Sequence, residues 1–194
     1  MDFGLLRDAF WGLTFDGLAL GAIYALISLG YTLVYGVLRL INFAHSEVFM
    51  IGTFSALVAS GIMGVKIEDD PRTGWGMIFT LLICLIAAMI ASAVTAVLVE
   101  IIAYRRLRQR GATKLATLIS AIGVSISLVE AFRILTDSLP REFPRIMDKT
   151  FLFSYAGADV RNDKVIVIIA AGLMMFALER FISKSRYGKG IRAV

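Results

Sequence analysis

The feature that most constrains this chain is a pair of long uncharged runs separated by a short polar stretch. Residues Gly17–Leu38 carry no acidic or basic side chain over 22 positions, and Val48–Val65 carry none over 18. An α-helix rises about 1.5 Å per residue, so roughly 20 apolar residues cross the hydrocarbon core of a bilayer. The two runs therefore predict two membrane-spanning helices joined in a tight hairpin.

The overall composition agrees with a membrane protein. Hydrophobic residues make up 58% of the 194 positions, and the mean hydropathy is +0.79, which is too apolar for an ordinary soluble domain. We expect residues 1–194 to form a single transmembrane domain without a soluble module. The fold class predicted is an all-α polytopic membrane protein with about five transmembrane helices.

The order of apolar and charged segments predicts where the crossings lie. A short helix over Gly4–Phe15, which mixes apolar residues with Arg7 and Asp8, is expected to lie in the membrane interface before the first crossing. The segments predicted to span are Asp16–Leu38, Val48–Val65, Gly74–Ala103, Leu115–Leu135 and Val165–Ile182. The length of the last of these segments also suits a buried or re-entrant helix.

The distribution of basic residues predicts the orientation. The segments Tyr104–Lys114 and Arg180–Val194 are rich in Lys and Arg and contain no Asp or Glu. Basic residues near helix ends mark the cytoplasmic side of a membrane protein. We therefore expect the N-terminus outside, the C-terminus in the cytoplasm and the loop Lys66–Thr73 outside. The net charge of +5 could suggest a nucleic-acid partner, but the distribution of the basic residues argues against one.

A dense group of polar residues lies between the first two spans, and it contains the only histidine of the chain. Its members are Asn42, Phe43, His45, Ser46 and Glu47. One interpretation is a helix start, in which Ser46 or Asn42 caps backbone N–H groups and Glu47 favours the positive end of the helix. The other is a role in lining or gating a pathway, because polar groups at membrane depth face protein or water.

Two enzymatic interpretations of this group are weaker. A zinc site needs three or four ligands, and the chain offers no second His and no thiolate nearby. A serine hydrolase is also disfavoured, because adjacent Ser46 and His45 do not naturally adopt attack geometry. An intramembrane enzyme that uses His45 and Glu47 remains an alternative. We expect no catalytic residue, cofactor or metal.

Three further features carry structural expectations. Glu130 and Arg133 are three positions apart on one helical face and are expected to pair. Glu100 is expected to be an ordinary interfacial residue near water or Arg105. The stretch Phe151–Val160 is interpreted as an ordered external loop.

Both ends of the chain resemble a known family. The glycine-punctuated run from Gly17 through Tyr24 to Gly36 is followed by Ile41-Asn42-Phe43-Ala44-His45-Ser46-Glu47, and the tail runs Ser185-Arg186-Tyr187-Gly188-Lys189-Gly190-Ile191-Arg192-Ala193-Val194. This pattern resembles the permease subunits of branched-chain amino-acid ATP-binding-cassette importers, specifically the first of the two paired permeases. The tail is similar to the segment that leads into the ATPase-coupling region of that family.

The resemblance implies a transport subunit in a bacterial or archaeal plasma membrane, not an enzyme. Its partners would be a second permease, two cytoplasmic ATPases and a periplasmic or lipid-anchored substrate-binding protein. The substrates would be branched-chain amino acids or related amino acids and amides. The residues from Asn42 to Glu47 would lie near the pathway. The residues expected to contact the ATPase are Arg186, Tyr187, Gly188, Gly190 and Arg192.

The family continues beyond this segment with the rest of its coupling region and about three further spans. We therefore expect the 194 residues to correspond to the N-terminal part of a longer family domain, as a truncated product or a fragment. A non-transporting membrane anchor or assembly protein is the alternative function. No residue in the sequence identifies the particular amino acid carried.

Overall fold

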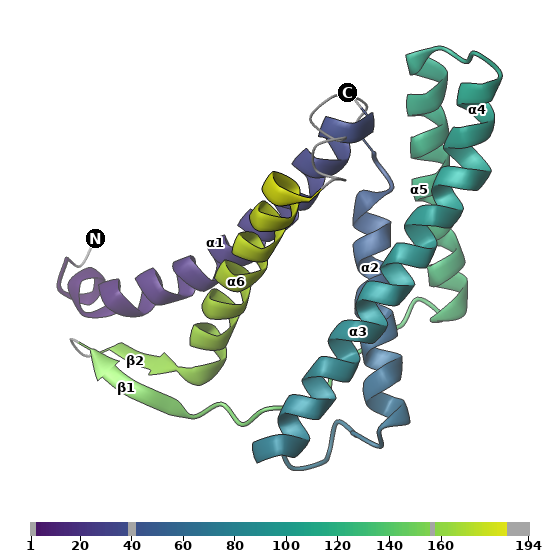
Figure 1. Cartoon of the computed structure of the whole chain (residues 1–194). Coiled ribbons are helices and arrows are strands. Elements are labelled where there is room, and N and C mark those ends of the chain that lie inside the picture. Colours follow the sequence, from purple (N-terminus) through teal and green to yellow (C-terminus); the bar gives the residue numbers. More distant parts are fainter. Residues whose placement is uncertain (1–2, 39–41, 156–157, 186–194) are drawn as a thin grey trace. The chain divides into compact units, whose positions relative to one another are not determined.

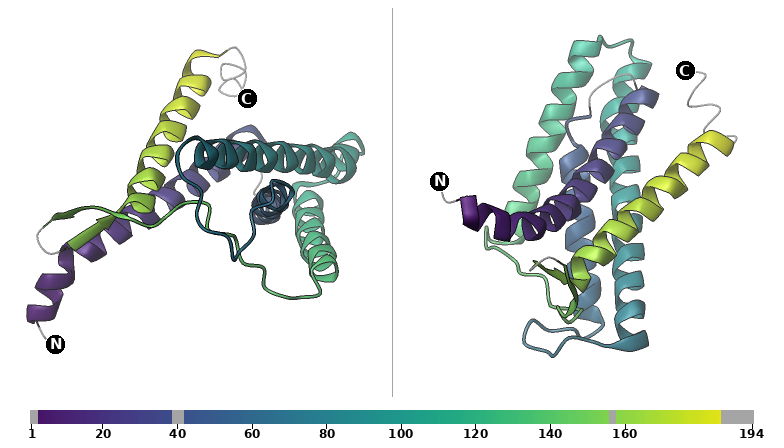
Figure 2. Two further views of the ribbon diagram at one scale, coloured as in Figure 1. Left: turned by 90° about the horizontal axis from the view of Figure 1, so that it is seen from below. Right: turned by 90° about the vertical axis from the view of Figure 1, so that its left-hand side faces the viewer.

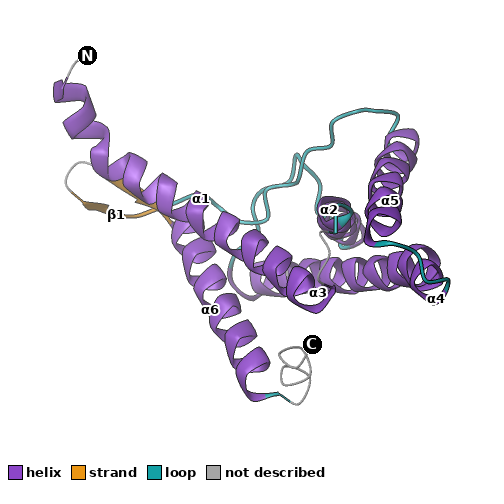
Figure 3. Cartoon of the chain, turned by 90° about the horizontal axis from the view of Figure 1, so that it is seen from above, coloured by secondary structure: helices purple, strands orange, loops and turns teal. Residues whose placement is uncertain are grey.

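The computed structural model describes residues 3–38, 42–155 and 158–185. These residues fall into two compact units, one with described residues 3–38, 149–155 and 158–185, the other with residues 42–148. Helices account for nearly all of the regular structure in the described ranges, with strands only in one hairpin (Figures 1 and 3). A single domain over residues 1–194 stays a prediction.

The first unit is built on two long helices, α1 (Phe3–Leu38) and α6 (Asn162–Lys184). The helix α6 packs against α1 (Figure 2), and Lys164 forms an ion pair with Asp16. The helix predicted over Gly4–Phe15 is wrong as a separate element, because α1 runs through it without a break. No proline interrupts the chain between Phe3 and Leu38, so no proline ends the helix at Phe15.

A β-hairpin completes the first unit, where the sequence predicted an ordered loop. Strands β1 (Phe151–Tyr155) and β2 (Ala158–Arg161) pair antiparallel, with Ser154 opposite Asp159. The stretch is therefore ordered, as predicted, but its described residues form paired strands and not an irregular loop. The physical reason is the alternation of aromatic residues at 151, 153 and 155, a period of two that favours a strand.

The second unit contains the helices α2 (His45–Ile62), α3 (Gly74–Val99) and α5 (Lys114–Leu135). A π-helix, η1 (Glu100–Arg105), and the short α4 (Arg106–Gln109) prolong α3 into one rod of 36 residues (Figures 1 and 2). At the tight turn into α5, Gly111 adopts a φ of +66°, a conformation that favours glycine. The Thr113 side chain then caps α5 by accepting from the Ala116 N–H.

Within the described ranges, five helices are long and apolar enough to cross a membrane. The five predicted spans each coincide with one of them, including the last, for which α6 supplies 23 residues. The starts differ most at the first span, where the apolar part of α1 begins at Phe10 and the prediction began at Asp16; α2 begins at His45, three residues before the predicted span. Many side chains on the outer faces of these helices are apolar and exposed, such as Ile90 and Val94 on α3, which suits a lipid surrounding.

The ion pairs in the structure agree only in part with those predicted from the sequence. Arg133 Nη1 lies 3.4 Å from Glu130 Oε2, which confirms the pair predicted on one face of α5. Glu100 pairs with Arg108 and not with Arg105. Because the π-helix carries an extra residue per turn, simple α-helical spacing does not identify this partner.

The helices α2 and α3 approach closely at Gly52. Ser92 Oγ on α3 donates to the Val48 carbonyl oxygen on α2 at 3.1 Å. A Cβ atom added at Gly52 would lie 2.4 Å from Ser92 Oγ and 3.3 Å from the Ala88 carbonyl oxygen. Small residues at such a crossing let helix backbones approach in lipid.

Gly52→Ala is therefore expected to destabilise the protein by about 1–3 kcal/mol, the usual cost of overpacking. The measurement is thermal unfolding of the detergent-purified protein. Adding Ser92→Ala removes the nearest clashing atom and should recover a large part of the loss. Gly61→Ala is the matched control, because a Cβ there meets no heavy atom within 4 Å. Equal effects at Gly52 and Gly61 would contradict this account of the crossing.

At the opposite end of the second unit, Arg72 ties three segments together. Its Nη2 donates to the Met63 carbonyl oxygen at 2.8 Å, just past the end of α2, and its Nη1 donates to Thr80 Oγ1 on α3 at 3.0 Å. Its backbone N–H donates to the Ile146 carbonyl oxygen at 3.1 Å. Ile146 is buried in a cluster with Val65 and Cys84. The loop that follows α5 is thereby fastened to the ends of α2 and α3.

Candidate functional site

The polar residues between the first two spans form a compact turn, called the polar corner here (Asn42–Glu47). The Asn42 side-chain oxygen accepts from the Ala44 N–H at 3.1 Å, and the Asn42 carbonyl accepts from the His45 N–H at 3.2 Å. This local pattern is the one by which asparagine favours a turn. It brings Ala44 to full burial and starts α2 at the next residue.

The capping hypothesis holds only in this limited form. The residue before α2 is Ala44, and no side chain caps the helix. Ser46 lies inside the first turn, where its hydroxyl donates to Glu47 Oε2 at 3.0 Å. Capping by Ser46 is therefore wrong, and Asn42 binds an N–H just outside the helix.

Glu47 is the buried charge of the corner, with 8% of its surface exposed. Its Oε1 accepts from Ser125 Oγ on α5 at 2.8 Å, so the carboxylate links α2 to α5. It occupies the first turn of α2, where the helix dipole favours a negative charge. Within residues 42–155 and the other described ranges, Glu47 has no ion-pair partner.

Tyr104 fixes the other side of the polar corner. It lies in the π-helix η1, and its hydroxyl donates to the Asn42 side-chain oxygen at 2.6 Å. Only 5% of Tyr104 is exposed, and it packs in a cluster with Ala44, Val99 and Ala121. Single π-helical turns in longer helices are frequent at functional sites. The corner is thus held by α5 through Glu47 and by η1 through Asn42.

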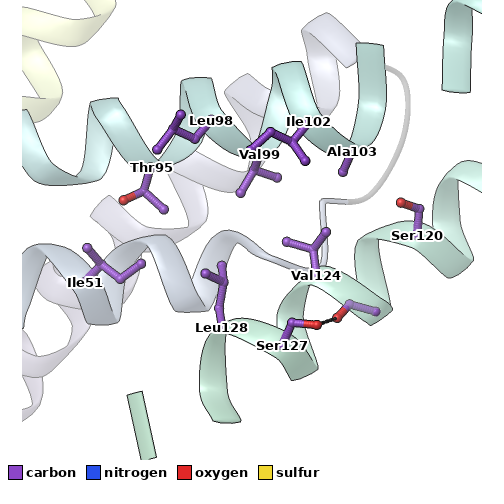
Figure 4. A pocket seen from close by; sticks show the side chains of 11 residues that line it. Ile51, Thr95, Leu98, Val99, Ile102, Ala103, Ser120, Val124, Ser127 and Leu128 are labelled. Carbon is purple, nitrogen blue, oxygen red and sulfur yellow. Dashed lines mark hydrogen bonds between the residues drawn. The ribbon is translucent and has the colours of Figure 1, made fainter. Parts of the chain in front are cut away.

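A cavity of about 620 Å³ adjoins the polar corner. Figure 4 shows Ile51 on α2, Val99 on α3, and Val124 and Leu128 on α5 around it. Val99, Val124 and Leu128 also belong to the cluster that packs on Ala44 and Tyr104, so the cavity and the corner share a wall. Three hydroxyl side chains line the same cavity, namely Thr95, Ser120 and Ser127.

The lining hydroxyls are partly committed to their own helices. Thr95 Oγ1 donates to the Ala91 carbonyl at 2.8 Å, and Ser127 Oγ donates to the Gly123 carbonyl at 2.7 Å. Their oxygen lone pairs remain available as acceptors. The cavity therefore combines an apolar surface with a few polar groups, a composition that suits a small ligand.

Comparison with known proteins assigns the family. A profile described as branched-chain amino acid transport system / permease component matches residues 13–194. The chain belongs to this permease family. With five long apolar helices in the part of the chain that the structure describes, it is a multi-pass membrane protein, and the prediction of a helical polytopic fold is confirmed.

Individual permeases of the family resemble the chain over most of its length. The high-affinity branched-chain amino acid transport system permease protein BraD of Pseudomonas aeruginosa is 36% identical over 181 residues, which cover 92% of this chain and 56% of BraD. The corresponding proteins LivH of Escherichia coli and Salmonella typhimurium are 34% and 35% identical over 183 residues, with the same coverage. The chain therefore spans about half the length of the curated permeases it matches. No solved structure matches it significantly.

The permease structure brings together only part of the predicted site. Asn42, Ser46 and Glu47 join one hydrogen-bonded arrangement with Tyr104 and Ser125. Phe43 is 41% exposed, and His45 is half-buried at the start of α2. The residues predicted to couple to an ATPase lie outside the described residues, and they are Arg186, Tyr187, Gly188, Gly190 and Arg192.

Sequence reasoning missed Tyr104 and Ser125 as partners of the corner. Both are polar groups close to or inside an apolar span, and such groups in membrane helices tend to bond across helices. This signal marks them as candidates. It does not say which partner each one takes.

Proposed function

We propose that this chain is part of a membrane permease subunit of an ATP-binding-cassette importer for branched-chain amino acids or related amino acids and amides. The observation that carries the proposal is the family match over residues 13–194. The proposed location is the plasma membrane of a bacterium or archaeon. The proposed partners are a second permease, two cytoplasmic ATPases and a periplasmic or lipid-anchored binding protein. We propose no enzymatic activity for His45 and Glu47.

Within this function, the polar corner acts as part of the pathway or gate. Its polar groups are satisfied in pairs, and each long-range pair joins two elements, Glu47 with Ser125 and Asn42 with Tyr104. Separating a pair leaves polar groups that need water or a polar solute instead. Movement of α2 against α5 or η1 is therefore coupled to the entry of such a solute. Phe43 and His45 belong to the same turn and complete the proposed gate.

Uptake by the assembled importer tests the function directly. The protein is co-expressed with the proposed partners, two ATPases, a second permease and a binding protein, and labelled leucine is added to sealed vesicles. We expect uptake that requires ATP and the binding protein. An assembled complex that hydrolyses ATP without moving any branched-chain amino acid would favour an assembly or anchoring role.

The proposed orientation places the N-terminus and residues 66–73 outside, and residues 104–114 and the tail from Arg180 inside. The basic segments of the sequence support this arrangement. Single cysteines introduced at Arg108 and at Asp70 test it in intact cells. A membrane-impermeant maleimide should label Asp70→Cys and not Arg108→Cys. The reverse pattern would overturn the orientation.

A further inference from the structure

The loop that follows α5 is held in a defined place although it has no regular structure. At its start, the Thr136 N–H donates to the Phe132 carbonyl at 2.9 Å and the Ser138 N–H donates to the Arg133 carbonyl at 3.0 Å. At its end, the carbonyl oxygen of the buried Ile146 accepts a hydrogen bond from the Arg72 N–H. The residues between these two attachments, including Arg141 and Glu142, are thereby held beside the end of α2.

A cavity of about 580 Å³, called the loop cavity here, lies between this loop and the end of α2. Leu57, Val65 and Ile67 contribute apolar surface from α2 and the residues after it. Arg141 and Glu142 contribute charges of opposite sign from the loop. Lys66 adds a second positive residue. The volume falls in the range typical of small-molecule sites, roughly 300–1,000 Å³.

The charged side chains that line the loop cavity are exposed to solvent, and none of them forms an ion pair with another described residue. Among the described residues, neither Arg141 nor Glu142 has an ion-pair partner or a side-chain hydrogen bond, and the Lys66 ammonium has none either. Arginine binds carboxylates through two parallel hydrogen bonds, and a glutamate accepts from an ammonium group. Adjacent opposite charges above an apolar surface match a zwitterion that has an aliphatic side chain.

A second cavity, of about 660 Å³, lies beside the first and is lined by residues of α2 and α5. Arg141 and Leu57 line both cavities and therefore lie between them. The second cavity is bounded mainly by apolar side chains, among them Phe54, Phe132 and Leu135. An aliphatic side chain reaching past Arg141 would meet this apolar surface.

We propose that the loop cavity is the first binding site for the transported amino acid on the outer side of the membrane. Arg141 binds the α-carboxylate, Glu142 binds the α-ammonium group, and the branched side chain lies against Leu57 and the neighbouring apolar residues. The inference rests on the proposed import function and names the site at which the substrate is received.

Equilibrium binding of labelled leucine to the purified importer in lipid nanodiscs, without the binding protein, tests this site. Arg141→Gln and Glu142→Gln should each weaken leucine binding roughly tenfold or more, because a charge-assisted hydrogen bond is lost. Arg145→Gln is the matched control: Arg145 is an exposed residue of the same loop that does not line the cavity. Competition by 4-methylpentanoate, which lacks the ammonium group, and by 3-methylbutylamine, which lacks the carboxylate, should be much weaker than competition by leucine.

Two outcomes would overturn the site. One is that wild-type nanodiscs bind no leucine, and the other is that Arg141→Gln and Glu142→Gln bind it as tightly as the wild type does. Vesicle uptake separates these outcomes from failure of the function. Uptake by the wild type together with either outcome rejects the loop cavity alone, whereas absence of uptake rejects the import function itself.

Discussion

Replacing Glu47 by alanine is expected to reduce leucine uptake by the assembled importer to background. The carboxylate is almost fully buried and is the acceptor for both Ser46 and Ser125. Its removal leaves two hydroxyls without their acceptor and breaks the link between α2 and α5. A hydrogen bond to a charged group contributes about 1.5–3 kcal/mol, so the thermal unfolding temperature of the purified complex should also fall.

Two variants separate the charge of Glu47 from its hydrogen bonds. Glu47→Gln keeps an acceptor oxygen for Ser125, so we expect near-normal stability and reduced uptake if the pathway uses the negative charge. Glu130→Ala is the matched control, because Glu130 is exposed and pairs only with the exposed Arg133. That control should change stability by no more than about 0.5 kcal/mol. Normal uptake by Glu47→Ala would show that the polar corner is not part of the pathway.

The membrane-spanning helices were predictable because one physical requirement dominates them. A charge inside the hydrocarbon core is costly, so an uncharged run such as Gly74–Val99 can be recognised without any knowledge of its neighbours, and α3 covers that same range. The start of α2 was predicted less exactly. The uncharged run begins at Val48, and the interpretation as a helix start named Ser46 or Asn42 as the cap, whereas α2 begins at His45 after Ala44. Glu47 lies in the first turn, where its carboxylate accepts from two hydroxyls.

Only the turn of the candidate site could be predicted from the sequence, and not the residues that bind to it. The turn from Asn42 to Glu47 stands out as a polar cluster between two apolar spans. Its partners lie far along the chain, Tyr104 at 62 residues from Asn42 and Ser125 at 78 residues from Glu47. Contacts of that separation depend on how helices pack, and the local pattern that identifies a helix contains no information on its neighbours. The π-helix adds a further shift in the face that Tyr104 presents.

The hydrogen bond between Tyr104 and Asn42 is expected to be the second contact whose loss has a large effect. Tyr104→Phe keeps the ring in the cluster with Ala44 and Val99 and removes only the hydroxyl, which leaves Asn42 with the Ala44 N–H as its remaining donor. We expect a loss of stability of about 1 kcal/mol and a clear fall in the rate of uptake, because η1 no longer holds the turn before α2.

A double-mutant cycle with Asn42→Ala measures the coupling itself. If the two side chains act through their mutual bond, the effects of Tyr104→Phe and Asn42→Ala on unfolding will be less than additive, by about 0.5–1.5 kcal/mol. Tyr35→Phe serves as the control, because Tyr35 is 56% exposed on α1 and its hydroxyl has no hydrogen-bond partner among the described residues. Strictly additive effects would mean that the bond between η1 and the polar corner does not contribute. The two variants could instead be non-additive in the rate of uptake and additive in the free energy of unfolding. That result would indicate that the bond acts during the movement of α2, because the bond would then form or break between two folded conformations of similar stability.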